Sequence, residues 1–241
     1  MIDFNQLEKN KEIFREEFLL AKPFPYLVID DFCRQDDAEA LFNQLPKDYL
    51  RSRNNVFSRD KFEKKHCEIN SEIYQLFYKE LNSDRFQEFL SFVSNESVFI
   101  DPTYHGGGLS QTKAGSCLDM NLDFNYHPKH PEWFRNLNLF FYLNKDWEEE
   151  YGGHLIIEDF RTEESKKIPV PFNRLVIQQS RSFTLHGHDP IRFPKYTCKN
   201  SITSYAYSFH KNRVEKLRPI SKAVKNKPNN FRDYVSYTLI N

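Results

Sequence analysis

The chain lacks several features that would assign it to a class at once. Its formal net charge is zero, with 34 Lys and Arg against 34 Asp and Glu, and phosphate contacts need a surplus of cations. No apolar run approaches the roughly 18 residues of a membrane-spanning helix. The opening stretch, MIDFNQLEKNKEIF, contains no apolar core of a secretory signal. We therefore expect neither nucleic acid nor a membrane among its partners.

Cysteines are few and show no pairing pattern. The four stand far apart in the sequence, without a Cys-x-x-Cys motif, at Cys33, Cys67, Cys117 and Cys198. Such spacing is typical of reduced thiols rather than of a disulfide scaffold. The sequence therefore predicts a cytoplasmic protein.

Aromatic residues, in contrast, are abundant. They make up 16% of the 241 residues, with 23 Phe and 13 Tyr, and a disordered chain would be poor in them. The periodicity predicts an amphipathic helix over 5–19, a strand over 23–32 and a second helix over 36–45. One long or two short helices are expected in 71–92.

Short β-type runs separated by turn residues follow from residue 98 onward. A series of short strands at this spacing favours a sandwich or jelly roll, with the early helices supporting one sheet. The expected strands are 98–100, 137–143, 154–158, 174–178, 182–186 and 202–209.

The expected fold is therefore mainly β with N-terminal helices (α+β), a double-stranded β-helix of the jelly-roll, cupin-like type. We expect a single domain over 1–209, with helical support in 1–95 and a jelly-roll core in 96–209. Residues 210–241 form a basic C-terminal extension with eight Lys and Arg and two acids, expected to be a solvated surface.

Residues suited to metal chemistry gather in the middle of the chain. All seven glycines lie between 106 and 187, and six of the eight histidines lie between 105 and 188. Alternation along a strand places Asp119, Asn121 and Asp123 on one face. His186, about 60 residues later, could meet them inside a sandwich. A carboxylate and histidines that leave one face of the metal open form a non-haem iron centre, although an Asp–His pair by itself is more often a structural hydrogen bond.

A second group is suited to holding a carboxylate. Lys199 and Ser201 share a strand face at the start of an aromatic strand, and Tyr142 lies on the face of Asn138 and Phe140. An ammonium supplies charge and a hydroxyl supplies a directed donor. A surface lysine at the start of a strand is the alternative interpretation of Lys199.

Four stretches in this order resemble the 2-oxoglutarate- and Fe(II)-dependent dioxygenase superfamily, in particular its prolyl-4-hydroxylase-like branch. They are PFPYLVIDDFCRQDDAEALF, the GGGL to DFNYHP stretch, YLNKDW to GGHL, and FNRLVI to HGH. The resemblance covers residues 22–209. It implies that Fe(II) and 2-oxoglutarate are the cofactors, and that dioxygen and a small-molecule or peptide substrate are the partners.

The resemblance also implies roles for single residues. The metal carboxylate falls on Asp123 and the distal metal histidine on His186. The basic residue that pairs with the far carboxylate of 2-oxoglutarate falls on Lys199, with Ser201 in the family's Arg-x-Ser pattern. Two further cosubstrate contacts fall on Tyr142 and Gln111.

One position departs from the family. The family motif is His-x-Asp, whereas this chain has Asn121-Leu122-Asp123, so an amide replaces the first metal histidine. Asn121 could ligate through its oxygen or leave a place for water. Alternatively, a nearby residue substitutes for the histidine, the candidates being Asp119, His105, His127 and His154.

In a third alternative the site is inactive, and the domain is a jelly-roll module that binds a ligand or a partner. Because Asp123, His186, Tyr142, Lys199 and Ser201 are all kept in register, we favour an oxygenase, of hydroxylase type, with altered metal chemistry. The sequence identifies neither the substrate nor the oligomeric state.

Overall fold

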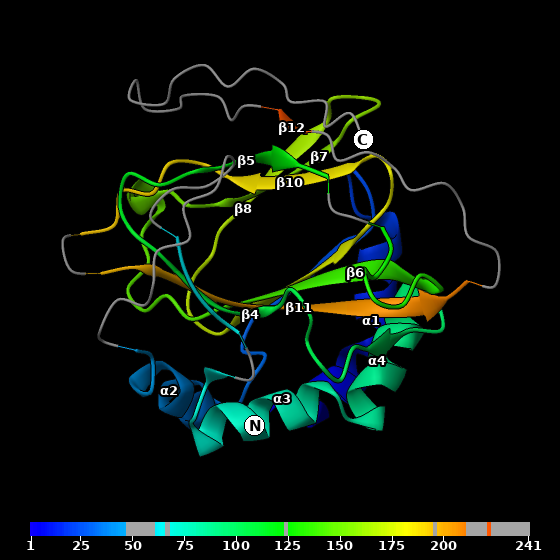
Figure 1. Ribbon diagram of the computed structural model, residues 1–241, viewed down its shortest axis with the longest axis horizontal. Helices are drawn as coiled ribbons and strands as arrows, with labels where there is room; N and C mark the ends of the chain where they lie inside the picture. The colour runs from blue at the N-terminus through cyan, green and yellow to red at the C-terminus, as the bar shows by residue number, and fades with distance from the viewer. Residues whose placement is uncertain (47–60, 66–67, 123–124, 195–196, 211–220, 223–241) are drawn as a thin grey trace.

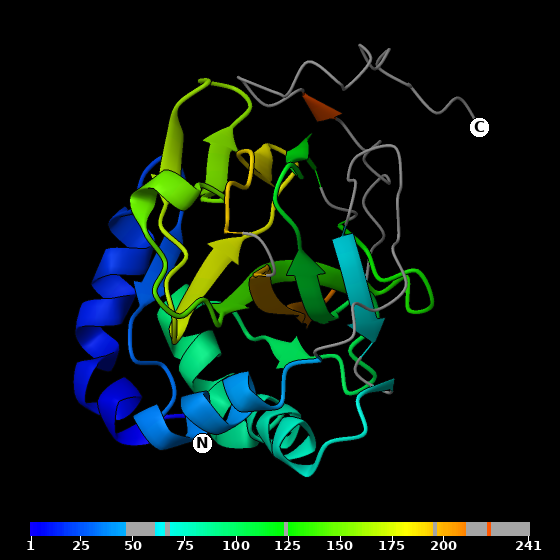
Figure 2. The same cartoon turned by 90° about the vertical axis from the view of Figure 1, so that its left-hand side faces the viewer.

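Two antiparallel sheets face each other, and helices cover the outer side of the larger one (Figure 1; Figure 2). This computed structural model describes residues 1–46, 61–65, 68–122, 125–194, 197–210 and 221–222. The predicted metal ligand Asp123 therefore lies outside the described residues, as do Cys67 and most of the basic extension. The proposed division at residues 95 and 209 stays a prediction.

The larger sheet has the strand order β1-β9-β6-β11-β4-β2, and β3 also pairs with β11. Its strands are β1 (Tyr26–Ile29), β2 (Lys61–Lys65), β3 (Phe99–Ile100), β4 (Gly108–Thr112), β6 (Trp133–Tyr142), β9 (Arg174–Gln179) and β11 (Lys199–Phe209).

The smaller sheet has the strand order β12-β5-β10-β7-β8. Its strands are β5 (Leu118–Asn121), β7 (Leu155–Asp159), β8 (Ser165–Ile168), β10 (Thr184–His188) and β12 (Ser221–Lys222). These two facing antiparallel sheets confirm the predicted jelly roll. The expected strands did not include β2, β4, β5, β8 and β12, which are short and mostly polar.

The helices are α1 (Phe4–Leu20), α2 (Gln35–Asn43), α3 (Glu72–Leu81) and α4 (Asp84–Ser94), with a short 3-10 turn η2 at Glu149–Tyr151. The stretch 71–92 thus holds two helices. Ser83 begins the second, because its side chain accepts a hydrogen bond from the backbone N–H of Phe86. Within the part of the chain that the structure describes, none of the helices has the length and apolar character needed to cross a bilayer.

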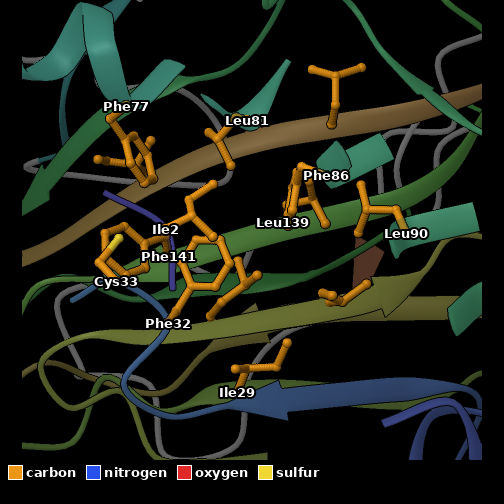
Figure 3. Packing of buried hydrophobic residues seen from close by; sticks show 14 of the residues in the cluster. Ile2, Ile29, Phe32, Cys33, Phe77, Leu81, Phe86, Leu90, Leu139 and Phe141 are labelled. Atoms are coloured by element: carbon orange, nitrogen blue, oxygen red, sulfur yellow. The ribbon is translucent and has the colours of Figure 1, made fainter. Parts of the chain in front are cut away.

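Alternation along β6 builds two separate cores. Leu137, Leu139 and Phe141 face the helices and join a large cluster with residues of α3 and α4 (Figure 3). Phe140 and Tyr142 point the other way, into the space between the two sheets. In a strand, neighbouring side chains take opposite faces, so an unbroken aromatic run can supply both layers.

The two faces of β11 and β4 can be assigned in the same way. Ile202 and Leu109 belong to the helix-side cluster. Paired residues of an antiparallel ladder project to the same side. Every second residue of β11 counted from Ile202, and of β4 counted from Leu109, therefore faces the helices. The residues between them face the jelly-roll interior.

Candidate cosubstrate and metal site

Three of the residues predicted to hold a carboxylate come together on the inner face of the larger sheet. Ser201 on β11 pairs directly with Tyr142 on β6. Lys199 lies two residues before Ser201, and its Nζ is 5.6 Å from the centroid of the Tyr142 ring. Lys199 and Tyr142 are both buried. The structure therefore contradicts the surface-lysine interpretation of Lys199.

Tyr142 can act there as a hydrogen-bond donor. Burial raises the pKa of its phenol well above the usual value of 10, because the interior disfavours the charged form. The hydroxyl therefore keeps its proton at neutral pH. Together with the Lys199 ammonium, it offers donors to an anion.

Strand β4 adds two hydroxyls that the sequence interpretation missed. Ser110 pairs with Ser201, and Thr112 pairs with Lys199, so both side chains share the inner face. The buried Ser110 Oγ makes no hydrogen bond with any residue that the structure describes. Alternation within the segment GLSQT was the signal that could have found these hydroxyls.

Gln111 is not brought to this group. It pairs with Asn200 and donates from Nε2 to Asn200 Oδ1 over 3.0 Å. By parity both residues lie on the helix side of the sheet, the opposite side from Lys199 and Ser201. A one-residue difference in a strand reverses the face, so the cosubstrate contact expected at Gln111 lacks geometric support.

Gly153 approaches Lys199 closely, and a charged cluster follows it in the chain. A Cβ on Gly153, whose φ is +71°, would lie 3.3 Å from Lys199 Cδ, so the missing side chain leaves room for the lysine. His154 follows directly, with Nε2 2.8 Å from Glu149 Oε1 and Nδ1 3.2 Å from Asp189 Oδ2. Hydrogen bonding to Asp189 is the main reason that the pKa of His154 is raised.

His186 and Asn121 lie side by side on neighbouring strands of the smaller sheet. Asn121 on β5 pairs with His186 on β10. The His186 ring is buried, and its centroid lies 5.3 Å from that of Phe140 on the facing sheet. The imidazole therefore points into the jelly-roll interior.

Two hydrogen bonds fix the amide of Asn121. Its Nδ2 donates to the backbone carbonyl oxygen of Asp119 over 3.0 Å and to that of His186 over 3.1 Å. With both amide hydrogens used, Oδ1 is the atom left to face a cation. Asp119 is buried on the same strand.

The other candidate substitutes make contacts elsewhere. His127 Nε2 lies 3.2 Å from Asp101 Oδ2, and its Nδ1 accepts from the backbone N–H groups of Lys129 and His130. The ring of His105 packs against His127. His154 has a carboxylate at each ring nitrogen. These contacts do not bring a ring nitrogen of His105, His127 or His154 next to His186.

The residues present fit 2-oxoglutarate better than they define a metal site. An ammonium, three serine or threonine hydroxyls and a phenol on one buried face match the donors that a carboxylate needs. Among the described residues, which exclude Asp123, there is no group of three or more His, Cys, Asp and Glu that could hold a metal ion. Asn121 and His186 are the predicted ligands that the structure brings together.

Comparison with known proteins supports the same family. The model of the 2OG-Fe(II) oxygenase superfamily matches residues 107–207. A search of curated proteins finds no match.

Solved structures share the fold at low sequence identity. A prolyl hydroxylase from Trichoplax adhaerens, in complex with a hypoxia inducible factor peptide fragment, is 15% identical; the match covers 84% of this chain and 92% of that one, with a TM-score of 0.62. A Pseudomonas putida prolyl-4-hydroxylase is 13% identical, with 83% and 100% covered and a TM-score of 0.60. HygX from Streptomyces hygroscopicus, with nickel and 2-oxoglutarate bound, is 12% identical, with 77% and 83% covered and a TM-score of 0.51.

The sequence model and the shared fold confirm the resemblance that the motifs indicated. Residues 107–207, which include the candidate residues from Gln111 to Ser201, match the 2OG-Fe(II) oxygenase superfamily, whose cofactors are Fe(II) and 2-oxoglutarate, and the solved structures share the fold.

Proposed function

We propose that this chain is a 2-oxoglutarate-dependent oxygenase, of hydroxylase type, with a metal site formed by Asn121, Asp123 and His186. The observation that carries the proposal is the buried donor group of Lys199 and Tyr142, on the face that looks toward His186. An ammonium and a phenol on one inner face can both donate to the same carboxylate, as the distal end of 2-oxoglutarate requires.

The chain's residues have separate tasks in this proposal. Lys199, Tyr142 and Ser201 bind the distal carboxylate of 2-oxoglutarate, and this orients its other end toward His186. The interior residues Phe140, Val176 and Ile157 exclude water from the space between the sheets. When bound, the iron and cosubstrate supply the oxidation of the substrate by dioxygen.

Asn121 is the unusual part of the metal site. Its amide oxygen is a harder and weaker donor than imidazole, so we expect weaker Fe(II) affinity than a histidine would give. The hydrogen bonds to two backbone carbonyls favour Oδ1 as the atom that meets the metal. The bound 2-oxoglutarate would compensate in part, because it chelates the same ion.

Anaerobic titration of the chain with Fe(II) and 2-oxoglutarate tests the proposal, with Asn121→Ala and Asn121→His as matched variants. We expect a charge-transfer band with the natural chain. Asn121→Ala should weaken metal affinity by at least about 10-fold, the size of a lost supporting contact. An unchanged affinity in Asn121→Ala would mean that Asn121 does not ligate, and the absence of any band would refute the oxygenase.

Asn121 itself favours a second candidate function, a non-catalytic jelly-roll module that binds a ligand or a partner. Succinate production separates the two. If the natural chain makes none and Asn121→His creates it, the natural protein is inactive. If turnover exists and Asn121→His leaves it unchanged or lowers it, Asn121 belongs to a working site.

The substrate remains at the level of a class. The Trichoplax neighbour holds a peptide, and we propose a peptidyl or small-molecule substrate here, to be found by screening for substrate-stimulated succinate release. The cytoplasmic location also stays a proposal, which cell fractionation tests.

A further inference from the structure

A cavity of about 470 Å³ lies on the helix side of the larger sheet, beside the end of α2. Gln111, Asn144 and Asn200 are among the residues that line it, and we call these three residues its floor. Because Gln111 and Asn200 face away from the jelly-roll interior, the sheet separates this cavity from Lys199 and Tyr142. Its volume falls within the range of small-molecule sites.

The floor carries an incomplete hydrogen-bond network. Gln111 Nε2 donates to Asn200 Oδ1 over 3.0 Å, and the Asn200 backbone N–H donates to Asn144 Oδ1 over 2.6 Å. Asn144 Nδ2 in turn donates to the backbone carbonyl of Val170. Gln111 Oε1 is buried and accepts no hydrogen bond from the part of the chain that the structure describes. An unsatisfied buried acceptor is unfavourable, so a ligand that brings a donor to Gln111 Oε1 would be bound more tightly than one that does not.

The walls are aromatic. Phe42, Tyr151 and Phe193 line the cavity, and the ring centroids of Tyr151 and Phe193 lie 5.6 Å apart. Lys145 also lines the cavity, but its ammonium pairs with Glu39 and lies 4.7 Å from the Phe42 ring centroid. With this cation paired, the walls favour a flat, uncharged body rather than an anion.

We propose that this cavity binds a neutral, planar heteroaromatic molecule that donates one N–H to Gln111 Oε1. The floor supplies the acceptor, and Phe42, Tyr151 and Phe193 supply the faces against which the ring packs. The site is distinct from the cosubstrate site, which lies on the other face of the same strands. The proposal does not depend on the proposed oxygenase activity.

Titration of the full chain with indole and with 1-methylindole, without iron or 2-oxoglutarate, tests the proposal. The two probes share a ring, but only indole has the N–H. We expect indole to bind about 5-fold more tightly, the worth of one neutral hydrogen bond. Gln111→Met, which keeps the volume and removes the acceptor, should abolish this preference and leave binding of 1-methylindole.

The matched control is Gln178→Met, which removes an equally buried amide from the inner face of β9 and should leave the preference intact. If the Gln111→Met variant does not fold, the Phe42→Ala variant is titrated in its place. It should weaken the binding of indole and of 1-methylindole to the same extent. Equal binding of the two probes, no binding of either at millimolar concentration, or a preference that survives in Gln111→Met would overturn the proposal.

Discussion

Replacing Asp189 by Asn should destabilise the protein in a pH-dependent way. Asp189 Oδ2 lies 3.2 Å from His154 Nδ1 and 3.1 Å from Lys167 Nζ. Burial alone would raise the pKa of this carboxyl, but the hydrogen bonds from His154 and Lys167 lower it from 3.8 to about 2. Because Glu149 faces the other ring nitrogen of His154, the structure favours the doubly protonated imidazole.

The size of the effect follows from this pKa. The difference between 3.8 and about 2 corresponds to about 2 kcal/mol, and solvent screening at this rim reduces it to about 1 kcal/mol. The contribution of Asp189 is present above pH 3.8 and is lost as the pH falls toward 2. The contribution of His154, whose pKa is raised, is present below pH 6.5 and is lost as the pH rises through its folded-state value.

Urea unfolding of the natural chain and of Asp189→Asn at three pH values, about 3, 6 and 9, measures this effect. We expect the loss in free energy of unfolding to reach about 1 kcal/mol near pH 6 and to shrink on both sides. Glu150→Gln, which removes an exposed charge from the same turn, is the control and should have little effect. An equal loss at all three pH values, or an NMR-measured pKa of His154 that does not fall in Asp189→Asn, would refute the reasoning.

Three further variants test the site and the packing. Lys199→Met should weaken 2-oxoglutarate binding by about 10- to 100-fold, the worth of a charged hydrogen bond, in an anaerobic calorimetric titration; an unchanged affinity would exclude Lys199 from the site. Gly187→Ala would place a Cβ 2.7 Å from the Leu118 carbonyl oxygen and 3.0 Å from Met120 Sδ, so it should lower stability by about 1–3 kcal/mol; a neutral effect in urea unfolding would contradict the close approach of β5 and β10. Phe141→Ala empties the centre of the helix-side core (Figure 3) and should cost about 3–5 kcal/mol by the same assay, and a loss below about 1 kcal/mol would mean that the cavity collapses.

Local residue patterns were enough to predict the class of fold and to place several candidate residues on shared strand faces. Strand periodicity predicted β6, β7, β9, β10 and β11 near their observed bounds, because an apolar or aromatic run records burial directly in residue type. It also put Lys199 and Ser201 on one strand face and identified Tyr142 and His186. The shared strand face of Lys199 and Ser201 could be predicted because alternation within one strand is a local property of the chain.

The face that each strand turns toward the helices became clear only from the pairing of the strands. Gln111 stands between Ser110 and Thr112, and the sequence interpretation chose Gln111, while the two neighbours share the face of Lys199. Alternation along a strand predicts which residues share a face, but it does not predict which side of the sheet that face lies on. The side depends on pairing between β4 and β11, whose residues are about 90 positions apart. The contact of His154 with Asp189 and the fixed amide of Asn121 depend on such long-range pairing as well, so no local pattern could reveal them.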